Sequence, residues 1–204
     1  LIPVQNWYAP ALNAAAEAGV QSWATEDVVA LLTTGVAPHG SVLGPMAEVV
    51  FRSTQYLSDA DARAMAVYLQ ALPQHAATPA KQAVAPVSVM ERGAKVYEAQ
   101  CAQCHGAQGQ GAKDEAGQPA FPPLAGNRAV VLADPTNLVR VVLQGGYLPA
   151  TAGNPRPHGM PPFQHLLGDE DVAAVTTFVR NSWGNQAAGV GTIEVYRARE
   201  RRSP

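Results

Sequence analysis

The segment CAQCHG, residues 101–106, carries the side chains of this sequence that are best suited to chemistry. Cys101 and Cys104 are separated by two residues, and His105 follows the second cysteine directly. This spacing is typical of three kinds of site: a dithiol redox pair, part of a zinc site, and an anchor for a c-type haem. Each kind of site requires particular further residues or secondary structure elsewhere in the chain.

The rest of the sequence supplies neither the secondary structure expected for a redox pair nor the ligands expected for a zinc site. A thioredoxin-like pair lies in a strand–helix–strand setting, which the sequence does not offer. A structural zinc ion usually has four Cys or His ligands, whereas the chain has two cysteines. A disulfide between Cys101 and Cys104 would close a small, strained loop and leave His105 unexplained. The remaining histidines, which show no paired ligand spacing, are His39, His75, His158 and His165.

Haem attachment explains all three residues together, so we favour it over the zinc and redox alternatives. Each cysteine sulfur can form a thioether bond to one vinyl group of the porphyrin, and His105 can then bind the iron as the proximal ligand. Gly106 lets the backbone leave without a side chain that would strike the macrocycle.

Met160, in the segment HGMPPF, is the candidate sixth ligand of the iron. A thioether sulfur favours ferrous iron and raises the reduction potential. With ligands on both faces, the iron would pass electrons without readily binding oxygen or peroxide. His158 and His165 are rival ligands, and Met160 could instead simply fill the core.

Further residues could complete a haem pocket. Pro123 cannot donate a backbone hydrogen bond, so carbonyl groups near it could accept one from the ring of His105. Leu124 could cover the porphyrin. Gly93 is either a tolerated helical glycine or the point where the last helix crosses closely, near Phe178. Candidate partners for the haem carboxylates are Arg128, Arg140, Arg156 and Trp183.

Helix signals dominate the chain and strand alternation is nearly absent, which predicts an all-α protein. A length of 204 residues, 47% of them hydrophobic, suits one or two domains. The proline- and alanine-rich residues 73–87 are predicted to link an N-terminal piece, residues 1–72, to a C-terminal domain, residues 88–189. Residues 190–204 are expected to form a basic, solvated tail.

The charge and the hydropathy of the sequence exclude some classes of function. The net charge is −2, so the chain has no basic field that would attract nucleic acid. No apolar run approaches the roughly 20 residues of a membrane-spanning helix. The chain starts at Leu1 without an export signal, so we expect a removed signal or a fragment. The tail could also dock an acidic partner or anionic lipid through Arg197, Arg199, Arg201 and Arg202.

The chain contains an internal repeat with a shift of 110 residues. Residues 27–35 align with residues 137–145, and residues 57–69 align with residues 167–179. Between these blocks each copy has a loop with one methionine, Met46 or Met160. The first copy lacks a CxxCH segment, whose equivalent would lie upstream of Leu1.

Several motifs together resemble a known family. RGAKVYEAQCAQCHG, PPLAGN, GMPPF and VRNSWGN resemble the last haem domain of the cytochrome c subunit of membrane-bound bacterial alcohol, aldehyde and sugar-acid dehydrogenases. GPMAEVV and STQYLSDADARAMAVYL are similar to the later part of the preceding haem domain in those subunits. The resemblance covers nearly the whole chain.

This resemblance implies two class I cytochrome c-like domains, the first truncated at its N-terminus. It implies a periplasmic subunit at the outer face of the inner membrane, with three haem c groups in the family. By position, the last haem would be held by Cys101, Cys104, His105 and Met160, and Met46 would be the distal ligand of the preceding haem. The chain has one CxxCH. We therefore expect either a missing upstream segment or a haem-free remnant in which Met46 only packs.

The expected function is electron transfer in the respiratory chain, from a catalytic dehydrogenase subunit toward quinone or another redox acceptor. We expect a peripheral membrane association and no catalytic residue in the chain itself. The alternative is a haem enzyme, such as a peroxidase or a small-oxyanion oxidoreductase, with an open or displaceable sixth ligand.

Overall fold

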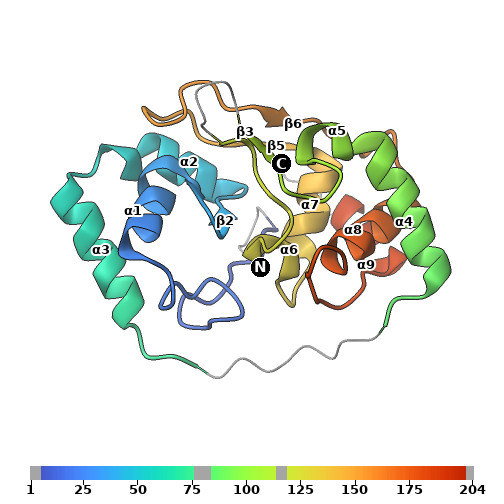
Figure 1. Cartoon of the computed structure of the whole chain (residues 1–204), viewed down its shortest axis with the longest axis horizontal. Coiled ribbons are helices and arrows are strands. Elements are labelled where there is room, and N and C mark those ends of the chain that lie inside the picture. The colour runs from blue at the N-terminus through green and yellow to red at the C-terminus, as the bar shows by residue number, and fades with distance from the viewer. Residues whose placement is uncertain (1–5, 76–83, 114–118, 201–204) are drawn as a thin grey trace.

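The computed structural model describes residues 6–75, 84–113 and 119–200. Within these residues the fold is mainly helical, as predicted, with three short antiparallel hairpins that the sequence did not predict. In Figure 1 the N-terminal part, residues 6–75, lies beside the C-terminal part, residues 84–200. No helix in the described ranges combines the length and the apolar character needed to cross a membrane.

The N-terminal part is built on the packing of α1 against α3. Its elements are α1 (Thr25–Thr34), β1 (Val36–Ala37), β2 (Gly40–Ser41), α2 (Pro45–Arg52), η1 (Thr54–Tyr56) and α3 (Asp59–Ala71). Gly35 ends α1 with φ of 80°, a conformation that favours glycine, and the chain then turns into the β1–β2 hairpin. The main buried cluster of this part contains Val20, Trp23, Val28, Ala37 and Ala66.

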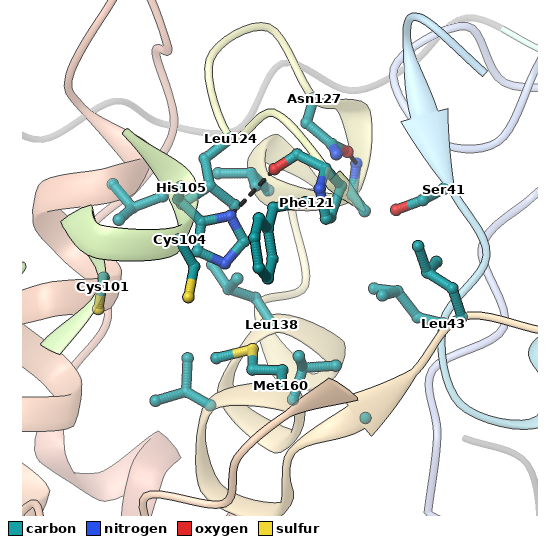
Figure 2. A pocket seen from close by; sticks show the side chains of 18 of the residues that line it. Ser41, Leu43, Cys101, Cys104, His105, Phe121, Leu124, Asn127, Leu138 and Met160 are labelled. Atoms are coloured by element: carbon teal, nitrogen blue, oxygen red, sulfur yellow. Dashed lines mark hydrogen bonds between the residues drawn. The ribbon is translucent and has the colours of Figure 1, made fainter. Parts of the chain in front are cut away.

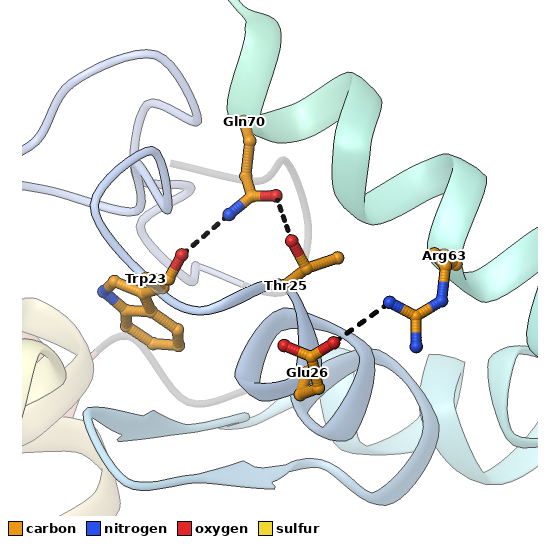
Figure 3. A network of polar contacts seen from close by, with 5 residues as sticks. All are labelled: Trp23, Thr25, Glu26, Arg63 and Gln70. Atoms are coloured by element: carbon orange, nitrogen blue, oxygen red, sulfur yellow. Dashed lines mark hydrogen bonds and ion pairs between the residues drawn. The ribbon is translucent and has the colours of Figure 1, made fainter.

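A small polar network fixes the start of α1 to α3 (Figure 3). Gln70 of α3 donates a hydrogen bond to the carbonyl oxygen of Trp23 at 2.7 Å and accepts one from the Thr25 hydroxyl at 3.1 Å. Arg63 and Glu26 form an ion pair at 3.0 Å between the same helices. Because this ion pair is exposed, it contributes little to the stability of the fold. The two Gln70 hydrogen bonds therefore fix the position of the start of α1 relative to α3.

The C-terminal part is organised by the crossing of α4 and α8. Its elements are α4 (Val87–Gln100), α5 (Ala102–His105), β3 (Ala112–Lys113), β4 (Pro119–Phe121), α6 (Arg128–Val131), α7 (Thr136–Gln144), β5 (Gly146–Tyr147), β6 (Gly159–Met160), α8 (Asp169–Arg180) and α9 (Thr192–Glu200). Gly93 of α4 faces Ala174 and Phe178 of α8, where an added Cβ atom would lie 2.6 Å from the Cβ of Phe178. The predicted close crossing is therefore present, and Gly93 permits it.

The expected solvated tail is wrong for residues 192–200, which form α9. Val195 and Ala198 are buried against residues of α7 and α8. Arg199 points inward and donates hydrogen bonds to Asp169 at 2.8 Å and to the Leu167 carbonyl at 3.0 Å. The two apolar side chains lie three residues apart among many charged residues, and this pattern was too weak to predict a packed helix. Arg201 and Arg202 lie outside the described residues.

The two parts contact each other directly. Asn137 of α7 forms a reciprocal pair with the Tyr8 backbone, accepting from its N–H and donating to its carbonyl, both at 2.9 Å. The Arg128 N–H donates to the carbonyl oxygen of His39 at 3.2 Å. The loop between β5 and β6 reaches across toward α2 and the following η1, where Gln55 of η1 donates to the Ala150 carbonyl at 3.4 Å (Figure 1). The predicted domain boundaries stay a prediction, and residues 76–83 of the linker lie outside the described residues.

Candidate functional site

The CxxCH residues lie on one wall of an apolar cavity (Figure 2). Cys101 joins α4 to α5, and its carbonyl oxygen accepts hydrogen bonds from the N–H groups of Cys104 at 3.2 Å and His105 at 2.9 Å. This single helical turn presents both sulfur atoms and the imidazole to the same cavity. Both cysteines are free thiols, so the disulfide alternative is not present in the structure.

The electrostatics of the cysteines do not favour a redox pair. Burial, together with the neighbouring Cys104, raises the pKa of the Cys101 thiol to about 11. A reactive dithiol needs the opposite shift, because the thiolate is the nucleophile. The described residues also contain no group of three or more His, Cys, Asp and Glu side chains that could hold a metal ion, so the zinc alternative has no ligand set there.

The His105 ring is oriented by one hydrogen bond. Its Nδ1 lies 3.0 Å from the carbonyl oxygen of Pro122, to which it donates, and its second nitrogen faces the cavity (Figure 2). Burial lowers the pKa of His105, and the Pro122 bond partly offsets that effect. A neutral imidazole held in this way is suited to bind iron, because the carbonyl raises its basicity.

The carbonyl acceptor near Pro123 was expected, and the structure identifies it as that of Pro122. Pro123 itself does not line the cavity. Its carbonyl oxygen accepts instead from the Asn127 side chain at 2.9 Å, which fixes the loop behind His105. Leu124 lines the cavity, as expected.

Met160 lies across the cavity from His105 (Figure 2). It is carried by the β5–β6 hairpin, in which it pairs with Gly146. Gly145, with φ of 72°, lets the chain turn closely behind the Met160 backbone. His158 also lines the cavity, with its ring 4.6 Å from that of Phe121, whereas His165 does not.

The cavity walls between His105 and Met160 are mainly apolar. They come from α6, α7 and α8 and from the loop that carries Leu124, and they include Leu124, Val130, Leu138, Val141, Val142, Val175 and Val179. A nitrogen donor and a sulfur donor on opposite walls, with two thiols at one end, match the donors and the shape that a covalently held haem requires. The residues present therefore fit this group.

Comparison with known proteins agrees with this geometry. The cytochrome c family model matches residues 90–183. Cytochrome c-552 of Thermus thermophilus is 38% identical over 96 residues, which span 46% of this chain and 69% of that protein. The chain belongs to the cytochrome c family. A cytochrome c domain carries covalently bound haem c, which confirms the haem interpretation of the sequence.

Longer relatives of this cytochrome share nearly its whole length. The alcohol dehydrogenase (quinone) cytochrome c subunit of Gluconobacter oxydans (strain 621H) is 38% identical over 99% of this chain and 43% of its own length. The gluconate 2-dehydrogenase cytochrome c subunit of Pantoea cypripedii is 33% identical over 94% of this chain and 44% of its own length. The resemblance stated from the motifs is thereby confirmed, and the cytochrome spans less than half the length of these relatives.

The candidate partners for haem carboxylates do not line the cavity of the cytochrome. The Arg128 guanidinium lies 5.1 Å from the Trp23 ring and donates to the Gly19 carbonyl. Arg140 is buried 5.0 Å from the Trp7 ring. The remaining candidates are Arg156, which is exposed, and Trp183, which packs on Tyr97 at 4.8 Å.

One segment and one further residue near the cavity were not predicted from the sequence. The segment Ser41–Gly44 of the N-terminal part lines the cavity although it is remote from CxxCH in sequence, and no spacing marks it. Arg180 is 1% exposed and donates hydrogen bonds at 2.8 Å to the carbonyl oxygens of Val130, Leu132 and Ala188. Its three bonds connect the end of α6 with the loops that follow α6 and α8, beside the cavity wall.

Met46 lies apart from this cavity, in the first turn of α2, and is 49% exposed. It belongs to a group of exposed apolar side chains on α2, η1 and α3: Met46, Val49, Phe51, Tyr56, Met65, Val67 and Tyr68. In the repeat, Tyr68 corresponds to Phe178, which packs under α4 in the C-terminal part.

Proposed function

We propose that the chain is an electron-transfer module in which haem c is bound by thioether bonds to Cys101 and Cys104, with His105 and Met160 as the iron ligands. The observation that supports it most is the opposition of His105 and Met160 across an apolar cavity with both thiols at one end. The haem supplies the iron that is alternately oxidised and reduced.

The side chains of the site have separate roles in this proposal. His105, fixed by Pro122, gives the iron a basic ligand, and Met160 gives it a soft one that raises the reduction potential. The apolar walls exclude water, which also favours the less charged ferrous state. If both His105 and Met160 held the iron, it would not be open to peroxide, so the peroxidase-type alternative is not favoured.

We further propose the setting in which the electrons move. The relatives are named as cytochrome subunits of alcohol, fructose and gluconate dehydrogenases, and the first of these names includes quinone. By this relationship the module would receive electrons from a catalytic dehydrogenase subunit and pass them toward quinone or another redox acceptor. The proposed location is the periplasm, at the outer face of the inner membrane.

A second haem beside Met46 is part of the same proposal. The exposed apolar side chains around Met46 are suited to a partner that covers them, and the relatives are more than twice as long as the chain. An upstream segment with its own CxxCH would bring this haem, with Met46 as the distal ligand. Without such a segment, Met46 would be a surface residue.

Intact-mass measurement with a haem stain tests the covalent haem. We expect a mass increment of one haem for residues 1–204, and none for the double variant Cys101→Ser, Cys104→Ser. Near-infrared absorption of the ferric protein then tests Met160, because sulfur ligation gives a charge-transfer band. A colourless chain without added mass would overturn the proposal.

A further inference from the structure

The segment Ser41–Gly44 of the N-terminal part forms a wall of the haem cavity that belongs to the C-terminal part. We call it the 41–44 segment. In Figure 2, Ser41 and Leu43 lie on the side of the cavity opposite Cys101 and Cys104. The Ser41 hydroxyl points toward the cavity, and within the described residues it has no hydrogen-bond partner.

Contacts on the N-terminal side hold this segment in place. Ser41 pairs with Val36 in the β1–β2 hairpin, and the N–H of Val42 donates to the Gly35 carbonyl at 2.9 Å. Gly44 has φ of 52°, and an added Cβ atom there would lie 2.5 Å from the Trp7 ring. The indole therefore packs directly against Gly44, and Trp7 does not itself line the cavity.

Contacts with the C-terminal part fix the same segment from both ends. The Arg140 guanidinium covers the Trp7 ring at 5.0 Å, and the Asn137 side chain pairs with the backbone of the next residue, Tyr8. At the other end, the Arg128 N–H holds the His39 carbonyl, two residues before Ser41. The wall is thus built by both parts and does not depend on one flexible contact.

The structure of haem indicates which part of the group would lie beside this wall. The two vinyl groups of a porphyrin lie on one edge and its two carboxylates lie on the opposite edge. Thioether bonds at Cys101 and Cys104 would direct the vinyl edge to the α5 end of the cavity. The carboxylate edge would then face the opposite wall, where the 41–44 segment lies.

We infer that the 41–44 segment shields the carboxylate edge of the haem held by the C-terminal part, so that the N-terminal part raises the reduction potential of that haem. The inference rests on the proposed haem function. Leu43 keeps water from this edge, which disfavours the more highly charged ferric state. The Ser41 hydroxyl donates a hydrogen bond to a carboxylate and reduces the negative charge that would stabilise ferric iron.

Redox titration of variants in the complete haem-loaded chain tests the inference. Leu43→Asn keeps the approximate size of the side chain and makes it polar, and its matched control is Leu12→Asn, an exposed leucine outside the cavity. Ser41→Ala removes one oxygen atom with little risk to folding, and its control is Ser53→Ala, an exposed serine at the end of α2. We expect a lower midpoint potential for Leu43→Asn and Ser41→Ala, and wild-type potentials for both controls.

Two spectroscopic measurements separate this inference from the proposed function. Haem content and the ferric sulfur-to-iron band should stay at wild-type levels in all four variants, because none replaces a ligand. Unchanged potentials in Leu43→Asn and Ser41→Ala, with haem and band intact, would overturn the inference and leave the haem assignment standing. Absence of haem or of the band from the wild-type chain would remove the proposed function, and the inference with it.

Discussion

Phe178 of α8 lies so close to Gly93 of α4 that a Cβ atom added at Gly93 would be 2.6 Å from the Cβ of Phe178. The same added atom would also contact the carbonyl oxygen of Ala174. This crossing supports α5 and the CxxCH turn, because Phe178 and its neighbour Trp183 pack on Tyr97, four residues before Cys101. The packing of two helices therefore positions the proposed haem anchor.

Gly93→Ala is expected to destabilise the protein. Alanine improves helix propensity by about 1 kcal/mol, but the methyl group would force α4 and α8 apart at a cost of about 1–3 kcal/mol beyond that gain. Chemical denaturation of the haem-loaded chain measures the difference. Gly168→Ala is the control for added bulk, since an added Cβ there would approach no atom more closely than 4.0 Å. Gly168 is the N-cap of α8, where alanine is less favourable than glycine, so Gly93→Ala should lose more stability than this control. A Gly93→Ala variant as stable as wild type would show that the helices can separate freely.

Met160→Ala should open one axial position of the iron. We expect a lower midpoint potential, loss of the near-infrared band and faster cyanide binding, because alanine has no sulfur to donate. Loss of packing should also cost about 2 kcal/mol of folding stability. Met90→Ala, at a half-buried methionine of α4 outside the cavity, is the control. Retention of the band in Met160→Ala would exclude Met160 as the ligand and indicate another methionine sulfur. Absence of the band from the wild type would instead direct attention to His158.

Arg180→Met should be strongly destabilising although it preserves the linear, apolar first part of the side chain. Removal of the guanidinium leaves the carbonyl oxygens of Val130, Leu132 and Ala188 without these charged donors. Loss of such a buried network costs about 3–5 kcal/mol. Thermal unfolding should show a large fall in the midpoint temperature, compared with a small change for the exposed Arg156→Met. A small change in both variants would show that water replaces the guanidinium.

Local sequence patterns predicted a large part of this protein. Helix periodicity and end signals depend on neighbouring residues, so the mainly helical fold was confirmed without tertiary information. The CxxCH spacing also acts within one helical turn, and the cytochrome c family with covalent haem c was confirmed. The assignment of Met160 and Met46 to individual irons stays a prediction, because it depends on a bound group.

Contacts between segments that are distant in sequence could not be predicted from local sequence patterns. The strands of the hairpins have two or three residues and are too short to show an alternation pattern, and the charges around Val195 and Ala198 masked the apolar face of α9. Arginine is usually found at the surface, and the burial of Arg180 depends on three carbonyl groups, from the end of α6 and from the loops that follow α6 and α8. None of these partners lies at a fixed spacing along the chain.

The sequence by itself determined the helical class, the CxxCH turn at residues 101–105 and the family, because these depend on spacings within a few residues. The tertiary structure decided that Pro122 holds His105, that Met160 faces it, and that the 41–44 segment closes the cavity. The physical reason is that a cavity wall forms where packing brings surfaces together, and that packing is a property of the whole fold.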